Sequence, residues 1–356
     1  MENLYFRYGN GKTADLCQTA YNYREAGAKV IVMNADNNKE IASRVKPHGK
    51  SILTLEPNAK TDHIFEQGSR FSSEGVAAIL VDNAHMLTVK QVEQLFYLCK
   101  TYDITVFAYG NRINELGRAP SASMRFMELA DVIESLGDEN DLTNHARFQF
   151  YYGAMNACKT SQLLYRANYL HEQGLNVRTI KPSTDRSVTE ISSRIGLARK
   201  ADVVLGKEDR LYGDGEYFVR EHVNHIFVDE AQFLTGTQID DLSRINRDFN
   251  IPVSCYGLRT DFLTRSFEGS ARLLTLAELH KIKTICSCAK HGAEFNARKH
   301  KNGEYITSGD QIAVDDGGDI VYESLCEGCY IEKVQGIDLK NPDKVLRKLL
   351  EMKIVS

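Results

Sequence analysis

Residues 226–234 read IFVDEAQFL, and a matching stretch lies 147 residues earlier, where residues 79–87 read ILVDNAHML. Each stretch is an apolar run that ends in polar side chains, which is typical of a buried β-strand. The same offset relates three further pairs: Lys12-Thr13 to Lys159-Thr160, Tyr109-Gly110 to Tyr256-Gly257, and Arg125 to Arg272. A constant offset over so long a stretch indicates the tandem duplication of one domain.

Each copy alternates short β-branched runs with helical patterns, an order that predicts a parallel α/β sheet. The predicted elements of the second copy are strands at 148–152, 177–180, 226–228 and 253–256 and a helix at 161–173 that stops at Gly174. Lys181-Pro182 is expected to close the strand at 177–180. The first copy shows the same layout from Leu4 to Leu136.

The sequence also predicts how the chain is divided. A polar stretch at 137–147 without apolar periodicity is the expected linker between the copies. The predicted parts are a first domain at 1–136, the linker at 137–147, a second domain at 148–283, a cysteine-containing segment at 284–335 and a helical tail at 336–356.

Composition excludes several classes of protein. The 356 residues are 42% hydrophobic and 26% charged, values typical of a globular chain, and they contain no apolar run of membrane-spanning length. A formal net charge of -4 gives no electrostatic footprint for nucleic acid or for an anionic membrane. We therefore expect a cytoplasmic protein that binds neither nucleic acid nor a membrane.

A candidate phosphate-binding loop follows the strand at 148–152 and opens the next helix. It consists of Gly153, Ala154, Met155, Asn156, Ala157, Cys158, Lys159 and Thr160. In such a loop, backbone N–H groups point at an anion, the lysine reaches the β- and γ-phosphates, and the hydroxyl binds Mg²⁺. Cys158 stands where the pattern has glycine. If this position needs a positive φ, the Cβ costs about 1–2 kcal/mol, which weakens affinity about 5- to 30-fold. An ordinary strand-to-helix turn is the alternative interpretation.

Asp229 and Glu230 end an apolar strand about 70 residues after this loop. An aspartate in this place can hold Mg²⁺ through water, and the adjacent glutamate is a candidate general base. Two merely solvated carboxylates are the alternative, but their position after a phosphate-binding loop favours a functional pair.

The first copy has lost parts of both motifs. Its loop, Gly9 to Thr13, keeps Gly-Lys-Thr but is three residues shorter than the second loop, and Asn83 stands in place of the glutamate. An amide cannot accept a proton from an alcohol at neutral pH. The first copy is therefore predicted to be catalytically inactive and to serve as a scaffold or partner domain.

Four of the eight cysteines form two close pairs, Cys286 with Cys288 and Cys326 with Cys329. Two knuckle-like pairs separated by a loop indicate a tetrahedral Cys₄ zinc site, and this pattern suits a reducing compartment. His291 and His300 are interpreted as surface residues rather than ligands.

At these residues the second copy resembles the zinc-containing, bacterial-type thymidine kinases. The resemblance rests on YYGAMNA at 151–157, SSRIGL at 192–197, DEAQFL at 229–234, CYGLRTDF at 255–262, Phe267-x-Gly-Ser270 and the cysteine set. The first copy looks like the same family without the zinc segment. The resemblance implies two tandem P-loop (RecA-like) α/β domains with parallel sheets, the second carrying a small zinc-binding lasso.

The resemblance also implies roles for individual residues. Lys159 and Thr160 would serve ATP and Mg²⁺, with Asp229 on the metal, Glu230 as the base for the 5′-hydroxyl of deoxythymidine, and Arg186 near the phosphates. The lasso backbone near 314–318 would contact thymine. The residues implied for the nucleoside pocket are Met155, Phe233, Leu258, Phe262, Phe267 and Tyr322.

The leading hypothesis is an ATP-dependent deoxythymidine kinase with one active and one inactive copy. A non-catalytic nucleotide or nucleoside binder, or a structural subunit, stays open because neither loop has the full Gly-x₄-Gly-Lys-Thr pattern. Family members assemble as tetramers through two-fold contacts, so two duplicated chains are expected to form an equivalent homodimer.

Overall fold

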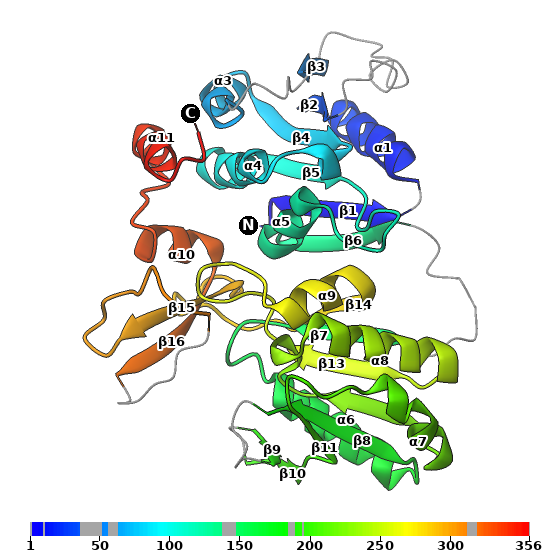
Figure 1. The fold of residues 1–356 in the computed structure, drawn as a ribbon. Coiled ribbons are helices and arrows are strands. Elements are labelled where there is room, and N and C mark those ends of the chain that lie inside the picture. Colours follow the sequence, from blue (N-terminus) through cyan, green and yellow to red (C-terminus); the bar gives the residue numbers. More distant parts are fainter. Residues whose placement is uncertain are drawn as a thin grey trace. The chain divides into compact units, whose positions relative to one another are not determined.

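The protein is described by a computed structural model that covers residues 2–9, 11–35, 52–55, 63–136, 147–183, 189–193, 196–311 and 319–355. Apart from Arg147, the expected linker lies outside these residues. The chain divides into two compact units, one formed by Met1–Asp141 with Ile331–Ser356 and the other by Leu142–Tyr330 (Figure 1). None of the helices in these ranges is long and apolar enough to cross a membrane.

The first unit is built on a six-stranded parallel sheet with the strand order β3-β2-β4-β5-β1-β6. Its strands are β1 (Leu4–Gly9), β2 (Lys29–Asn34), β3 (Ile52–Leu55), β4 (Val76–Asp82), β5 (Thr105–Tyr109) and β6 (Val132–Leu136). Its helices are α1 (Lys12–Glu25), α3 (Gly68–Ser73), α4 (Val89–Tyr102), α5 (Ser121–Leu129) and, from the end of the chain, α11 (Pro342–Glu351).

The second unit repeats this sheet in the order β11-β8-β12-β13-β7-β14, again parallel throughout. Its strands are β7 (Phe148–Tyr152), β8 (Val177–Pro182), β11 (Val203–Leu205), β12 (His225–Val228), β13 (Val253–Gly257) and β14 (Glu278–Lys281). Its helices are α6 (Lys159–Glu172), α7 (Gly215–Arg220), α8 (Gly236–Phe249) and α9 (Glu268–Leu276). Two antiparallel pairs are added, β9 (Glu190–Ser192) with β10 (Ala198–Lys200), and β15 (Phe295–His300) with β16 (Ile320–Leu325). Helix α10 (Glu327–Lys333) follows β16.

The duplication extends to details of the backbone. Helices α4 and α8 each begin with a capping box, formed by Thr88 with Gln91 and by Thr235 with Gln238, and each ends at a residue in the left-handed conformation. Both sheets have the same strand order. The predicted fold class of two tandem parallel α/β domains is therefore confirmed.

One predicted strand boundary was wrong. Strand β8 continues through Lys181 and Pro182 because it pairs with β11, where Leu205 lies opposite Pro182. Ser183 N donates the next hydrogen bond to the carbonyl of Leu205, at 2.7 Å. Proline lacks an N–H donor, but at the last residue of a strand the pairing does not need one.

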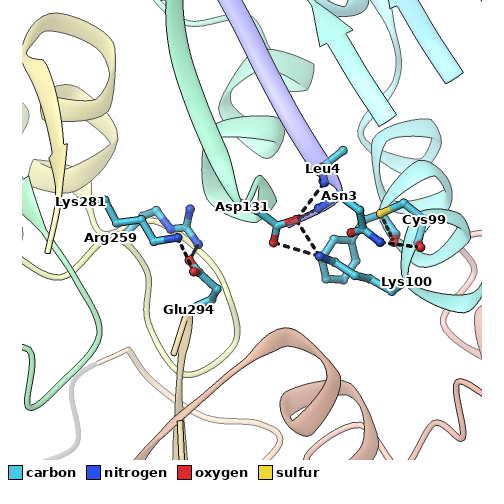
Figure 2. Close-up of polar contacts among 9 residues, drawn as sticks. Asn3, Leu4, Cys99, Lys100, Asp131, Arg259, Lys281 and Glu294 are labelled. Atoms are coloured by element: carbon cyan, nitrogen blue, oxygen red, sulfur yellow. Dashed lines mark hydrogen bonds and ion pairs between the residues drawn. The ribbon is translucent and has the colours of Figure 1, made fainter. Parts of the chain in front are cut away.

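A buried ion pair fixes the start of the first sheet. The Oδ2 atom of Asp131 accepts hydrogen bonds from the backbone N–H groups of Asn3 and Leu4, both at 2.8 Å, and lies 2.8 Å from Nζ of Lys100 (Figure 2). The side chains of Lys100 and Asp131 are only 7% and 2% exposed. Removing one partner would leave a buried charge without its counterion, so the pair holds the start of β1 beside the start of β6.

The end of the chain completes the first unit. Val345 and Leu349 of α11 are fully buried, and the unit places α11 against α4. Two polar contacts add to this packing: Gln94 Nε2 donates to the carbonyl of Ile354 at 3.0 Å, and the hydroxyl of Tyr97 donates to Oε1 of Gln335 at 2.9 Å. The helical tail is therefore part of the domain formed by the first copy.

We expect Leu349→Ala to destabilise the first unit by about 2–5 kcal/mol, because it leaves a cavity in a fully packed contact. Hydrogen exchange of α4 measures this effect. Lys348→Ala on the same helix, where the side chain is 41% exposed, serves as the control and should change little. Unaltered protection of α4 in Leu349→Ala would contradict the assignment of the tail to this unit.

A second prediction concerns His225 in the sheet of the second unit. Its Nε2 lies 2.9 Å from Oγ of Ser254, and burial, with a smaller contribution from the charge of Arg166, lowers the pKa of His225 to about 4. The unfolded chain therefore binds an extra proton as the pH falls through about 6.5, and the folded state loses stability between that pH and 4.

His225→Gln keeps a polar partner for Ser254 but cannot be charged. Melting temperatures of this variant should fall less steeply from pH 6.5 to pH 4 than those of the wild type. The exposed His222 provides the control, because His222→Gln should keep the wild-type slope. Equal slopes for His225→Gln and the wild type would contradict the prediction.

Candidate active site

The candidate phosphate-binding loop connects β7 to α6. The Nζ atom of Lys159 donates to the carbonyl oxygens of Gly153 and Ala154, at 3.1 and 2.9 Å. The lysine thus lies across its own loop, where an anion held by the loop would exchange these carbonyl contacts for phosphate oxygens. The next residue, Thr160, lies in the first turn of α6 with its hydroxyl directed at Asp229.

Cys158 adopts the left-handed conformation, in which a Cβ has a steric cost. It caps the N-terminus of α6 with φ 56°, and its side chain is exposed. The equivalent cap of α1 is Gly11, with φ 80°. A non-glycine residue in this region costs about 1–2 kcal/mol, so the loop of the second copy stores strain that the first copy avoids.

Asp229 lies at the end of β12, within reach of the loop. Its two carboxylate oxygens accept from Oγ1 of Thr160 at 3.1 and 3.2 Å. Burial, together with the charge of Glu230, raises the pKa of Asp229 to about 7. A hydroxyl and a buried carboxylate side by side form the donor set that Mg²⁺ uses in nucleotide sites, so these residues fit that cation.

Glu230 is held by a neighbour that sequence analysis did not identify. Its Oε2 accepts from Nε2 of Gln232, and Oε1 of Gln232 accepts from the backbone N–H of Leu258 at 3.1 Å. A Cβ on Gly257 would come within 2.6 Å of that same Oε1, so glycine makes room for the amide. Gln232 therefore orients the carboxylate of Glu230.

A cavity of about 350 Å³ joins these groups. Its lining consists of Met155, Asn156, Ala157, Cys158, Lys159, Thr160, Ser161, Ser192, Ser193, Glu230 and Leu258. The loop and Glu230 therefore open onto the same space, which would bring a phosphate chain next to a carboxylate. Ser192 and Ser193 belong to the SSRIGL stretch but were not assigned to the site from sequence.

The other residues expected near a nucleoside lie outside this lining. The rings of Phe233 and Phe267 pack edge to face with centroids 5.6 Å apart. Phe262 is buried beneath the guanidinium of Arg298, 3.8 Å from its ring centroid, and the hydroxyl of Tyr322 accepts from Nε of Arg298 at 3.1 Å. Arg186 and residues 314–318 lie outside the described part of the chain.

The four cysteines converge as expected for a metal site. Their sulfur atoms all lie within 4.8 Å of one another, close to the separation of about 3.8 Å that tetrahedral Zn–S bonds of 2.3 Å imply. Cys286 and Cys326 are buried, and Cys288 and Cys329 are half-buried. The donor set fits Zn²⁺. His291 is exposed, but its Nδ1 lies 3.8 Å from the sulfur of Cys288, at the edge of this cluster.

The pair of strands β15 and β16, which we call the cysteine hairpin, also contacts the phosphate-binding loop. Asn296 Oδ1 accepts from the backbone N–H of Met155 at 2.7 Å, and Ser324 Oγ donates to the carbonyl of Met155 at 2.6 Å. The ion-paired residues Arg259, Glu294 and Lys281 (Figure 2) line a small cavity together with Asn296. No sequence motif pointed to these contacts.

The corresponding place in the first copy has different chemistry. Lys12 Nζ donates to the carbonyl of Gly9 at 2.7 Å, which keeps the lysine across a shorter loop. Asn83 occupies the left-handed position of Glu230, with φ 53° against 49°, and its Nδ2 donates to Asn34 at 3.2 Å. The backbone is retained, while the ionisable group is replaced by an amide.

Comparison with known proteins gives the same assignment twice within the chain. The family model described as thymidine kinase matches residues 4–138 and again residues 146–330. A thymidine kinase of Enterobacteria phage T4 is 41% identical over 182 residues, which is 50% of this chain and 91% of the relative. Thymidine kinases of Pasteurella multocida and Vibrio cholerae are 38% and 40% identical, over 98% and 97% of their lengths and 53% and 52% of this chain.

The strain at Cys158 generates a prediction for nucleotide binding. Cys158→Gly removes the left-handed Cβ and should tighten ATP binding by up to about 5- to 30-fold. Isothermal titration of the purified protein with ATP measures the change. Cys255→Ala, at a buried cysteine outside the lining of the cavity, is the control for the loss of a thiol. An unchanged or weaker affinity in Cys158→Gly would show that the loop has adapted to cysteine.

Proposed function

The chain belongs to the thymidine kinase family of phosphotransferases, and on that premise we propose that its second copy transfers the γ-phosphate of ATP to the 5′-hydroxyl of deoxythymidine. One observation carries this proposal: the phosphate-binding loop and Glu230 line a single cavity. An acceptor hydroxyl placed between them would lie next to both the phosphate and a base.

In the proposed reaction, Glu230 accepts the proton of the 5′-hydroxyl as the oxygen attacks the γ-phosphorus, and ADP leaves. Gln232 keeps the Glu230 carboxylate oriented for this step. Lys159 exchanges the carbonyls of Gly153 and Ala154 for phosphate oxygens. Thr160 and Asp229 would hold Mg²⁺, which neutralises charge on the phosphates when bound.

For the nucleoside, we assign a set of apolar and aromatic side chains that begins in this cavity. Met155 and Leu258 already line the cavity. The aromatic residues Phe233, Phe262, Phe267 and Tyr322 complete the proposed set, and Arg186 is assigned to the phosphates. Flat aromatic and apolar side chains suit a pyrimidine base.

The cysteine cluster is assigned to structural zinc. Four sulfur donors leave no open coordination position, so the site would stabilise the cysteine hairpin rather than take part in the transfer. Such a cluster needs reduced thiols, which supports the proposed cytoplasmic location.

The first copy is assigned the role of an inactive scaffold. Asn83 cannot serve as a base, and the loop from Gly9 to Lys12 is too short to surround a triphosphate in the way of the second loop. The strain at Cys158 favours a second candidate function, in which the whole chain binds a nucleoside or nucleotide without turnover. Radiolabelled phosphate transfer from ATP to deoxythymidine separates the two.

We expect the chain to form a homodimer in which four domains reproduce the family's four-domain assembly, because closed two-fold assemblies are the usual form of soluble oligomers. Light scattering of the purified protein should give about twice the chain mass of 40.1 kDa. A monomeric mass at micromolar concentration would overturn this part of the proposal.

Glu230→Gln should lower kcat by about 10²-fold or more, the usual contribution of a positioned base, and leave ATP affinity nearly unchanged. Steady-state kinetics and ATP titration measure the two effects. Adding Asn83→Glu to this variant should not restore turnover, because the first loop is too short. Full activity of Glu230→Gln would remove Glu230 from the proposed role.

A further inference from the structure

The cysteine hairpin holds one residue of the phosphate-binding loop from both sides of its backbone. Asn296 on β15 lies directly opposite Ser324 on β16 in the antiparallel register. Asn296 accepts from the N–H of Met155, and Ser324 donates to the carbonyl of the same residue, at 2.7 and 2.6 Å. The exposed fractions of Asn296 and Ser324 are 4% and 8%, so water does not compete for these bonds.

The loop held in this way contains two non-glycine residues in the left-handed conformation. Asn156 has φ 65° and Cys158 has φ 56°, and both follow closely after Met155. Strained backbone of this kind persists only where the surrounding structure determines it. The bonds from Asn296 and Ser324 are buried contacts that supply such support.

The first copy provides a comparison within the chain. The residue before the loop lysine is left-handed in both copies: it is Gly11 in the first copy, with φ 80°, and Cys158 in the second. Glycine adopts this angle without a steric cost. The sequence of the first copy has no counterpart of the cysteine hairpin. The copy without the hairpin thus has glycine at this position, and the copy with the hairpin has cysteine.

We infer that Asn296 and Ser324 are positioning residues that hold the phosphate-binding loop in its nucleotide-competent form and compensate for the missing glycine at position 158. The inference rests on the proposed function, because it takes the ligand of the loop to be ATP. Neither residue contacts the reacting atoms in this role. Both act through the backbone of Met155.

We call the two bonds from Asn296 and Ser324 to Met155 the clamp. A further hydrogen bond connects this clamp to the cysteine cluster. The backbone N–H of Ser287, which lies between Cys286 and Cys288, donates to the carbonyl of Ser324 at 3.2 Å. Asn296 is fixed in turn by its Nδ2, which donates to the carbonyl of Thr260 at 3.5 Å. Ser324 therefore links the cysteine cluster to the phosphate-binding loop through hydrogen bonds on both sides.

The test is a double-mutant cycle in the full-length chain. Asn296→Ala is made in the wild type and in the Cys158→Gly variant, and the Kd for ATP is measured by titration calorimetry. In the wild-type background, Asn296→Ala should raise the Kd about fivefold or more, the size of one buried hydrogen bond. In the Cys158→Gly background it should raise the Kd less than about twofold, because glycine keeps the loop conformation without support.

Kinetics separate positioning of the loop from a general loss of structure. Asn296→Ala should raise the KM for ATP, while the KM for deoxythymidine and kcat change less than about twofold. Asn302→Ala, which removes an exposed amide at the tip of the same hairpin, is the matched control and should leave both KM values unchanged. If Asn296→Ala fails to fold, Ser324→Ala is used in its place, because it removes the other hydrogen bond to Met155 and deletes only one side-chain oxygen.

Equal effects of Asn296→Ala on the Kd for ATP in the two backgrounds would overturn the inference. An unchanged Kd for ATP in both Asn296→Ala and Ser324→Ala would also overturn it. If the wild type binds ATP but does not phosphorylate deoxythymidine, the proposed function fails and the cycle still decides the inference. If the wild type does not bind ATP, hydrogen exchange of residues 153–160 tests the inference instead. Exchange should rise in Asn296→Ala and return toward the wild-type level when Cys158→Gly is added. Equal exchange in all three forms would overturn the inference.

Discussion

The site depends on the parallel alignment of β7, β13 and β12, which are neighbours in the second sheet. Parallel strands end at the same edge, so the loop after β7 and the carboxylates after β12 meet there although they are about 70 residues apart in sequence. The hydrogen bond from Thr160 to Asp229 joins the two segments. The strand between them, β13, ends in Gly257, whose missing Cβ admits Gln232 and thereby fixes Glu230.

Much of the architecture was predictable because it follows from local patterns. Short apolar runs rich in β-branched residues, such as 226–228, favour buried strands, and the constant offset between the copies indicated two equal sheets. The clustering of the four cysteines was predictable from their spacing. The roles of individual site residues remain proposals, since similarity to a family does not place a substrate.

Other features could not be read from the sequence because they depend on contacts between distant segments. Asn296 and Ser324 carry no motif, and their meeting with Met155 follows from how the cysteine hairpin folds. The amphipathic pattern of α11 predicts that one face of the helix is buried, but it does not say against which element. The structure shows that α11 belongs to the first unit. The same holds for Pro182, which stays within a strand because of its neighbour β11.

The two copies show different ways of keeping one backbone shape. Asn83 and Glu230 occupy the same left-handed position, although only Glu230 can act as a base. The backbone turn after the strand is therefore kept in the first copy even though the ionisable side chain is not. In the loops the reverse has happened: the first copy keeps Gly11 without the carboxylate, and the second keeps the carboxylate with Cys158 in place of that glycine. Glycine lets a chain adopt the left-handed turn unaided, whereas cysteine in this conformation carries a steric cost and is held there by bonds from elsewhere. A loop with cysteine in this place is therefore tied to the hairpin that supports it, and the hairpin in turn to the order of its cysteine cluster.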